Sequence, residues 1–262
     1  MSARRFSLAV AASAISLLAF AGVASATHSW GGYHWARTGN PFTLKIGSSV
    51  SSVWKPILAT TSSDWSASDI LDTVIVPGAN KQPKNCRATS GRVEVCNASY
   101  GNNGWLGVAQ IWASGTHITQ GTVRLNDTYF NTSTYNTTAW RNLVSCQEVG
   151  HTFGLDHQDE NFNNPPLGTC MDYTSDPTLN QHPNLHDYGE LDLIYAHLDT
   201  VTTVAAGVPS GKGQDVDASE PKAWGKIVRE TKNKHGALYE NDLGKGEKVF
   251  TFVIWADQTE AQ

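Results

Sequence analysis

Two histidines and a glutamate lie close together in this chain, at a spacing that suits metal-assisted hydrolysis. Gln147, Glu148, His151 and His157 occur within one short stretch, residues 147–157, which we call the metal motif. Residues four apart lie on one face of a helix, so Gln147 and His151 can point at one ion. Glu148 is rotated by about 100° around the helix, which suits a base near that ion rather than a ligand. Three protein ligands and one open position are typical of a catalytic zinc site.

The metal motif requires a helix that stops soon after His151, so that the last ligand can turn back towards the same ion. Gly154 can adopt the left-handed backbone conformation that ends helices, and His157 then approaches from another direction. Two histidines at this spacing also occur by chance. Glu148 and the later Met171 agree jointly with a metal site, however, and the combination favours a site over coincidence.

At these residues the chain resembles the metzincin metalloproteases, whose motif is matched at Glu148, His151, Gly154 and His157. Their methionine-containing turn is matched by Met171. The Met-x-Tyr order is similar to the astacin and serralysin branches, which implies that Tyr173 ligates zinc or stabilises the oxyanion. The resemblance also implies hydrolysis of protein or peptide substrates by a metal-activated water, with Glu148 as the general base.

The first position of the metal motif departs from that family, because Gln147 stands where the family carries histidine. In this respect the chain looks like the gametolysin (autolysin) group, which carries Gln-Glu-x-x-His and remains proteolytic. The resemblance implies one catalytic Zn²⁺ held by Gln147, His151 and His157. An amide oxygen is a weaker zinc donor than an imidazole nitrogen, so we expect lower zinc affinity or another divalent metal. His117 is an alternative source of the missing histidine.

The resemblance covers roughly residues 41–200 and implies an α+β, metzincin-like fold. Such a fold has a twisted, mostly parallel five-stranded sheet, an active-site helix and a C-terminal helix. Alternating and β-branched runs predict strands at residues 42–46, 70–76, 91–98, 105–113 and 121–125. Helical spacing predicts helices at residues 50–65, from about 139 through the metal motif, and 185–198. The resemblance makes the strand at 105–113 the sheet edge that pairs with substrate, and an ordinary core strand is the alternative.

The first 26 residues have the layout of a secretory signal peptide. Arg4 and Arg5 precede an apolar run over residues 6–23, and Ala24-Ser25-Ala26 forms a small-residue cleavage site. An uncleaved membrane anchor is the alternative. Without residues 1–26 the formal net charge moves from -5 to -7, because only the two arginines are lost. We expect a secreted, extracellular monomer without membrane contact, and a mildly acidic chain has no electrostatic reason to bind nucleic acid.

All four cysteines lie after the signal peptide, and an even number in an exported chain predicts two disulfides. Three pairings are possible. We favour Cys86 with Cys96, which closes a short loop, and Cys146 with Cys170, which ties the metal motif to the segment after it. The sequence has no Cys-x-x-Cys pair, which argues against a thiolate zinc site.

Composition changes after Asp199, since residues 27–200 contain four lysines and residues 201–262 contain seven. We therefore expect a catalytic domain over 27–200 and a C-terminal extension over 201–262, made of a linker and a small β-hairpin-like appendage. Two other functions remain open. One is a catalytically silent metzincin-like domain that only binds, and the other is an adhesion protein in which the extension does the work. Glu148 argues against the silent domain, because binding alone needs no base there.

The remaining histidines and acids are expected to lie outside the site. Surface or helix positions are expected for His117, His182, His186 and His197. Asp156 suits a surface acid better than a ligand, and Asp159 and Glu160 lack the regular spacing of a calcium loop. Residues 27–40 are rich in aromatic residues and glycine, which predicts an irregular segment on the surface.

Overall fold

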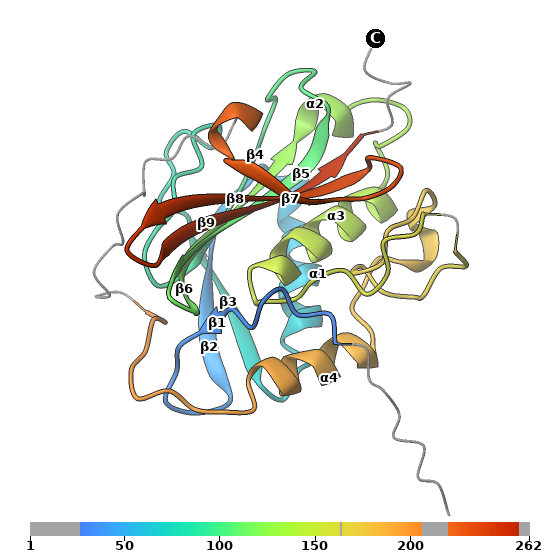
Figure 1. Cartoon of the computed structure of the whole chain (residues 1–262). Coiled ribbons are helices and arrows are strands. Elements are labelled where there is room, and N and C mark those ends of the chain that lie inside the picture. Colours follow the sequence, from blue (N-terminus) through green and yellow to red (C-terminus); the bar gives the residue numbers. More distant parts are fainter. Residues whose placement is uncertain (1–26, 163, 206–219, 257–262) are drawn as a thin grey trace, which may run out of the picture.

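The computed structural model describes residues 27–162, 164–205 and 220–256, and it has an α+β fold built on one large sheet (Figure 1). The predicted signal peptide and most of the predicted linker lie outside these residues. Among the described helices none has the length and apolarity needed to cross a membrane. In chain order the elements are β1 (His34–Trp35), β2 (Phe42–Ser49), α1 (Trp54–Trp65), β3 (Leu71–Pro77), β4 (Val93–Ala98), β5 (Trp105–Ser114), β6 (His117–Asn126), α2 (Asp127–Phe130), α3 (Thr138–His151), η1 (Pro177–Leu179), α4 (Leu185–Ile194), η2 (Pro221–Ala223), β7 (Lys226–Glu230), β8 (Gly236–Gly244) and β9 (Glu247–Trp255).

The sheet contains the five strands that the sequence predicts, in a mostly parallel arrangement. Its order is β3-β2-β4-β6-β5-β9-β8-β7, and the short β1 also pairs with β6. Neighbours among β2, β3, β4 and β6 are parallel, whereas β5 runs antiparallel to β6. Strands β4, β5 and β6 are buried along almost their whole length, as expected for strands covered on both faces.

The C-terminal extension contains an antiparallel pair of strands, β8 and β9, and it also joins the main sheet. Its three strands continue the main sheet, and β9 pairs antiparallel with β5 from Trp105 opposite Trp255 to Ser114 opposite Glu247. The sequence did not reveal β8, because residues 236–244 include two glycines, Asn and Asp, which are typical of turns. Pairing with β7 on one side and β9 on the other overrides that local preference.

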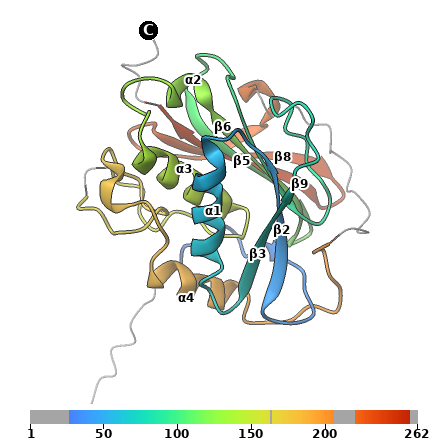
Figure 2. The same cartoon turned by 180° about the vertical axis from the view of Figure 1, so that it is seen from behind.

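Helices α1 and α3 pack together on one face of the sheet (Figure 2). Pro56 lies in the first turn of α1, where its missing N–H costs no helical hydrogen bond. Helix α4 begins at the predicted residue but ends at Ile194, before the predicted end at residue 198. The disulfides join Cys86 to Cys96 and Cys146 to Cys170, which is the pairing favoured above.

Residues 27–40 are irregular as predicted, apart from β1, but they are not a surface segment. Trp30 and Trp35 are 4% and 0% exposed and belong to the main hydrophobic core. Their indole N–H groups explain this burial, because they bond to backbone carbonyls at the end of α3. The sequence prediction failed because glycine content marked the backbone as irregular but gave no information on where the indoles pack.

Candidate metal centre

Helix α3 carries the first half of the metal motif into the core. The Thr137 side chain caps its N-terminus by accepting a hydrogen bond from the backbone N–H of Trp140 at 3.2 Å. Gln147, Glu148 and His151 are each only 1% exposed, so three polar side chains are buried on one short helical segment. Burial of unpaired polar groups is costly, and this concentration points to a functional site rather than to packing.

The end of α3 is held by three tryptophans and one glycine. Indole N–H groups donate to carbonyls of this segment, from Trp65 to Cys146 at 3.1 Å, from Trp30 to His151 at 3.1 Å and from Trp35 to Thr152 at 2.8 Å. The last two carbonyls lie where a helix leaves acceptors without internal partners. Gly154 has a φ of +101°, and a Cβ there would lie 2.3 Å from the carbonyl oxygen of Tyr33. Only glycine fits, so the chain turns back as the sequence predicts.

This turn brings the two histidines of the metal motif together. The Nε2 atoms of His151 and His157 are 3.0 Å apart, and the two rings are nearly perpendicular at 81°. Nδ1 of His151 lies 2.9 Å from the carbonyl oxygen of Leu155, which in the neutral ring assigns the proton to Nδ1 and the lone pair to Nε2. Burial, and then the neighbouring charge of His157, hold the pKa of His151 well below its usual value. The ring is therefore neutral and available as a ligand.

Gln147 lies one turn before His151 on α3, as its spacing predicts. Its amide Nε2 is buried and has no hydrogen-bond partner among the described residues. The amide nitrogen only donates hydrogen bonds, so the carbonyl oxygen is the atom of this side chain that could ligate an ion. A tetrahedral ion with nitrogen donors at about 2.0–2.1 Å separates those donors by about 3.3 Å, close to the spacing of the histidine pair.

The carboxyl group of Glu148 is enclosed between α3 and the strands β5 and β9. A Cβ at Gly107 would lie 2.8 Å from Oε1 of Glu148, so this glycine makes room for the carboxyl group. Burial raises the pKa of Glu148 well above its ordinary value, although the backbone amides of Ala109 and Ile254 oppose this by hydrogen bonding. Oε2 has no partner in the part of the chain that the structure describes. Glu148 thus holds a proton more readily than an exposed carboxylate does.

The segment after the metal motif returns beneath the histidines. The disulfide at Cys170 holds it to α3, and a Cβ at Gly150 would lie 2.7 Å from Sδ of Met171. The Tyr173 ring stacks on His157 with centroids 4.0 Å apart. Burial, followed by the nearby negative charge of Glu148, raises the pKa of Tyr173 well above its usual value. Its hydroxyl therefore keeps its proton and can act as a hydrogen-bond donor.

Strands β8 and β9 cover this group of residues. Phe252 on β9 stacks on His151, with ring centroids 4.0 Å apart and an interplanar angle of 12°. Gly236 on β8 lies against Tyr173, because a Cβ there would be 1.8 Å from the phenol oxygen. The prediction that β5 is an open sheet edge is therefore wrong, since β9 is hydrogen-bonded along β5.

An ion pair fastens the extension to the metal motif. Both terminal nitrogens of the Arg229 guanidinium bond to the carboxylate of Asp156, with Nη1 at 2.7 Å from Oδ2. Its Nε lies 2.9 Å from Oε1 of Glu160, and the same oxygen lies 3.5 Å from Nδ1 of His157. Burial alone would lower the pKa of Arg229, but bonding to Asp156 outweighs it and raises the pKa. Asp156 is thus an anchor for β7, not the free surface acid that the sequence led us to expect.

Sequence reasoning identified the residues on α3 and in the turns after it, but it missed those supplied by the extension. Gly236, Arg229, Phe252 and Ile254 belong to no motif. The run of residues 248–255 predicts a strand, but alternation along a strand does not say which strand is its neighbour. His117 lies 3.2 Å from Asp199, so it does not replace a histidine at Gln147.

Comparison with known proteins leaves the family of this chain open. No family model matches it, and no curated protein matches it either. One solved structure with some similarity is high choriolytic enzyme 1, a hatching enzyme zinc-protease from Oryzias latipes (medaka fish). The match covers 64% of this chain and 96% of that chain at 10% sequence identity, with a TM-score of 0.33. A similarity this low carries no argument about the present protein.

Proposed function

We propose that this protein is a secreted zinc-dependent endopeptidase that hydrolyses peptide bonds in protein or peptide substrates. The observation that carries the proposal is the pair of imidazole Nε2 atoms 3.0 Å apart, held at the end of a buried helix beside Glu148. Nδ1 of His151 is occupied by the Leu155 carbonyl, which is how proteins orient metal-binding histidines.

His151 and His157 would hold the ion through Nε2, and Gln147 would supply the third donor through its amide oxygen. This set leaves one coordination position for water or substrate, as in catalytic zinc sites. When bound, Zn²⁺ acts as a Lewis acid that polarises the scissile carbonyl and lowers the pKa of water. Because Gln147 is a weaker donor than histidine, another divalent ion can also suit the site.

Two further residues would handle the proton and the developing charge. Glu148, whose pKa is raised by burial, takes a proton from the attacking water and delivers it to the leaving amine. Tyr173, which stays protonated, donates a hydrogen bond to the negative charge that develops on the substrate carbonyl oxygen. Both side chains belong to the same buried group as the histidines.

The full chain would be latent, because its extension takes the place of a substrate. An extended peptide that approaches the site needs the free edge of β5, and β9 pairs with that edge. The Ile254 amide also bonds to Glu148, and Phe252 covers His151. We infer that cleavage requires strands β7–β9 to move away from the metal motif.

A cleavage assay on the exported chain, produced without a polyhistidine tag, tests the proposal. Casein hydrolysis should depend on metal, so that a chelator abolishes it and added Zn²⁺ restores it. Glu148→Gln should lower the rate by about 10²–10⁴-fold while zinc content stays unchanged. The assay is best repeated in an Arg229→Ala background, in which the extension is held less firmly.

The competing function is a catalytically silent binding domain. The covered site and the presence of Gln147 are also consistent with that function. The two differ in one result. If folded Arg229→Ala protein binds zinc and opens its extension but cleaves nothing, the domain is silent. Cleavage that is equal with chelator present would instead overturn the metal-dependent mechanism.

A further inference from the structure

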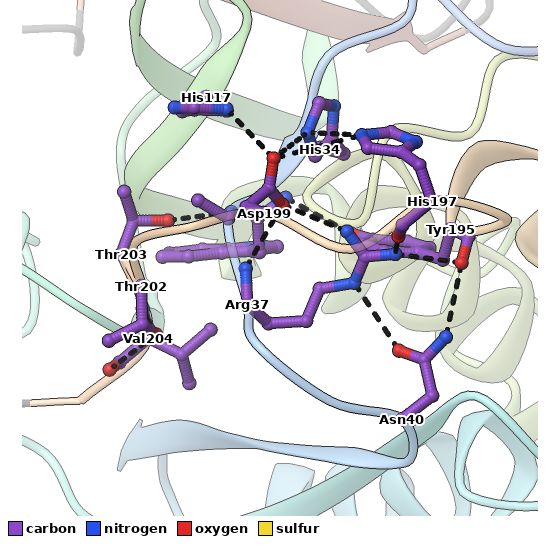
Figure 3. A network of polar contacts seen from close by, with 12 residues as sticks. His34, Arg37, Asn40, His117, Tyr195, His197, Asp199, Thr202, Thr203 and Val204 are labelled. Atoms are coloured by element: carbon purple, nitrogen blue, oxygen red, sulfur yellow. Dashed lines mark hydrogen bonds and ion pairs between the residues drawn. The ribbon is translucent and has the colours of Figure 1, made fainter.

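A second cluster of metal-binding side chains lies away from the metal motif, where β1 pairs with β6 (Figure 3). His34 on β1 and His117 at the start of β6 are partners in the strand register, which places them side by side. His197 and Asp199 reach the same point from the segment after α4. The sequence predicted only surface or helix positions for His117 and His197.

Their donor atoms converge on Oδ1 of Asp199. Nε2 lies 3.5 Å from that oxygen in His34, 3.2 Å in His117 and 3.8 Å in His197. The Nε2 atoms of His34 and His197 are themselves 3.1 Å apart. Donors around a tetrahedral ion at about 2.0–2.1 Å would be about 3.3 Å from one another, which lies within the range observed among His34, His197 and Asp199. These three side chains offer ligand atoms that all lie within 4.8 Å of one another, whereas His117 lies outside this group and pairs with the carboxylate.

The proton positions favour an ion between these atoms. Nδ1 of His34 lies 2.9 Å from the carbonyl oxygen of Gly32, which in the neutral ring assigns the proton to Nδ1. The lone pair of Nε2 then faces both the Asp199 carboxylate and Nε2 of His197. Lone pairs that face an anion repel it unless a cation or a proton lies between them. His151 has the same arrangement in the metal motif.

The carboxylate is held in position for this role by Arg37. Its backbone N–H and its Nη1 donate to Oδ2 of Asp199 at 3.1 and 2.9 Å, which leaves Oδ1 to the imidazoles. Arg37 is itself 2% exposed and donates to the carbonyl oxygens of Tyr195 and His197. A carboxylate oriented by buried partners is typical of the support around metal ligands.

We propose that His34, His197 and Asp199 form a second site for a divalent ion of the zinc class. Three protein donors would leave the fourth position to water, and His117, 3.2 Å from Oδ1, would help to hold the Asp199 carboxylate in place. The ion would join β1 to the segment after α4, which are far apart in sequence, and such a link adds its binding free energy to folding. One of these segments is β1, whose Trp35 bonds to Thr152 at the end of the metal motif's helix.

Metal content measured on the untagged full chain tests this proposal. The exported chain is stripped with a chelator, loaded with Zn²⁺, freed of excess metal and analysed by mass spectrometry. His197→Ala is the first variant, because that side chain is 54% exposed and its loss should not disturb folding. His34→Gln removes a second ligand independently, and glutamine keeps a polar side chain at this 5% exposed position. His182→Ala is the matched control, since that histidine is 53% exposed and also has a carboxylate partner, Asp64 at 2.7 Å.

Both ligand variants should bind one zinc equivalent fewer than wild type and His182→Ala. This difference does not depend on the metal motif, because loss of the proposed catalytic ion would lower the zinc content of all four proteins equally. Zn²⁺ should also raise the melting temperature of wild type and His182→Ala more than that of His197→Ala. Equal metal content in all four folded proteins would overturn the proposal and leave a hydrogen-bonded histidine cluster.

Discussion

The ring of Phe252 lies flat on the imidazole of His151, with centroids 4.0 Å apart and planes inclined by 12°. The first residue belongs to the last strand of the described chain, and the second is a ligand in the proposed catalytic site. A substrate side chain cannot lie on that imidazole while Phe252 does. In the proposed function, the extension and a substrate would therefore compete for this face of the ring.

Weakening the anchor of the extension should raise activity. Arg229→Ala removes the ion pairs to Asp156 and Glu160. Arg229 is 38% exposed, so solvent screening limits the lost stabilisation of the docked extension to about 1 kcal/mol. This corresponds to about a fivefold rise in the population of the open form and in the cleavage rate. Lys226→Ala is the matched control, because its pair with Glu240 lies within the extension at 3.9 Å.

Hydrogen exchange separates the two ways in which that test can fail. The amides of β9 should exchange faster in Arg229→Ala than in Lys226→Ala. Faster exchange without cleavage would contradict the enzyme proposal, whereas unchanged exchange would contradict the anchor.

Gln147→His should tighten zinc binding at the metal motif by on the order of tenfold or more and keep activity, because imidazole is a better zinc donor than an amide. Gln147→Leu should weaken binding instead, since it keeps the size of the side chain but removes the donor. Competition against a fluorescent chelator measures all three affinities. Three equal values would show that Gln147 is not a ligand.

Gly236→Ala should destabilise the contact between β8 and the site. The new Cβ would lie 1.8 Å from the Tyr173 hydroxyl oxygen, and overpacking of this kind costs about 1–3 kcal/mol. Gly189→Ala on α4 is the control, because a Cβ added there would meet no neighbouring element within 4 Å in the described part of the chain, and alanine favours helix by up to ~1 kcal/mol. Thermal unfolding measures this effect. The melting temperature should be lowered by Gly236→Ala and not by Gly189→Ala.

Trp35→Phe should lower the free energy of unfolding by about 1–3 kcal/mol, because it leaves the buried carbonyl of Thr152 without its indole partner. Trp140→Phe removes an indole N–H from a partly buried side chain, so it should lower the free energy of unfolding by less. Urea unfolding followed by circular dichroism compares the two. Similar losses would mean that ring size, not the hydrogen bond, determines the effect.

The local part of the site could be predicted from the sequence, and the part made by distant segments could not. Spacing along one helix and a glycine turn are sufficient to bring His151 near His157, since both depend on neighbouring residues. Phe252 reaches the same place only through pairing between strands far apart in the chain. The sequence around it predicts a strand but gives no information about its partner.

The same distinction applies to the second cluster. His34, His117 and Asp199 share no spacing that marks a metal site, because each lies in a different segment. Their meeting depends on the pairing of β1 with β6 and on where the chain runs after α4. Individually they look like ordinary polar residues, which is how the sequence led us to place His117.

The pairing of β9 with β5 also covers a strand edge that could otherwise pair with another molecule. Strand β5 is ten residues long and largely apolar, and an unpaired edge of that kind is a template for aggregation. With the extension in place, the outer strand is β7, which is five residues long and carries Lys226, Arg229 and Glu230. Short, charged edge strands resist intermolecular pairing. Removing the extension would therefore expose β5 and make the protein more prone to aggregate.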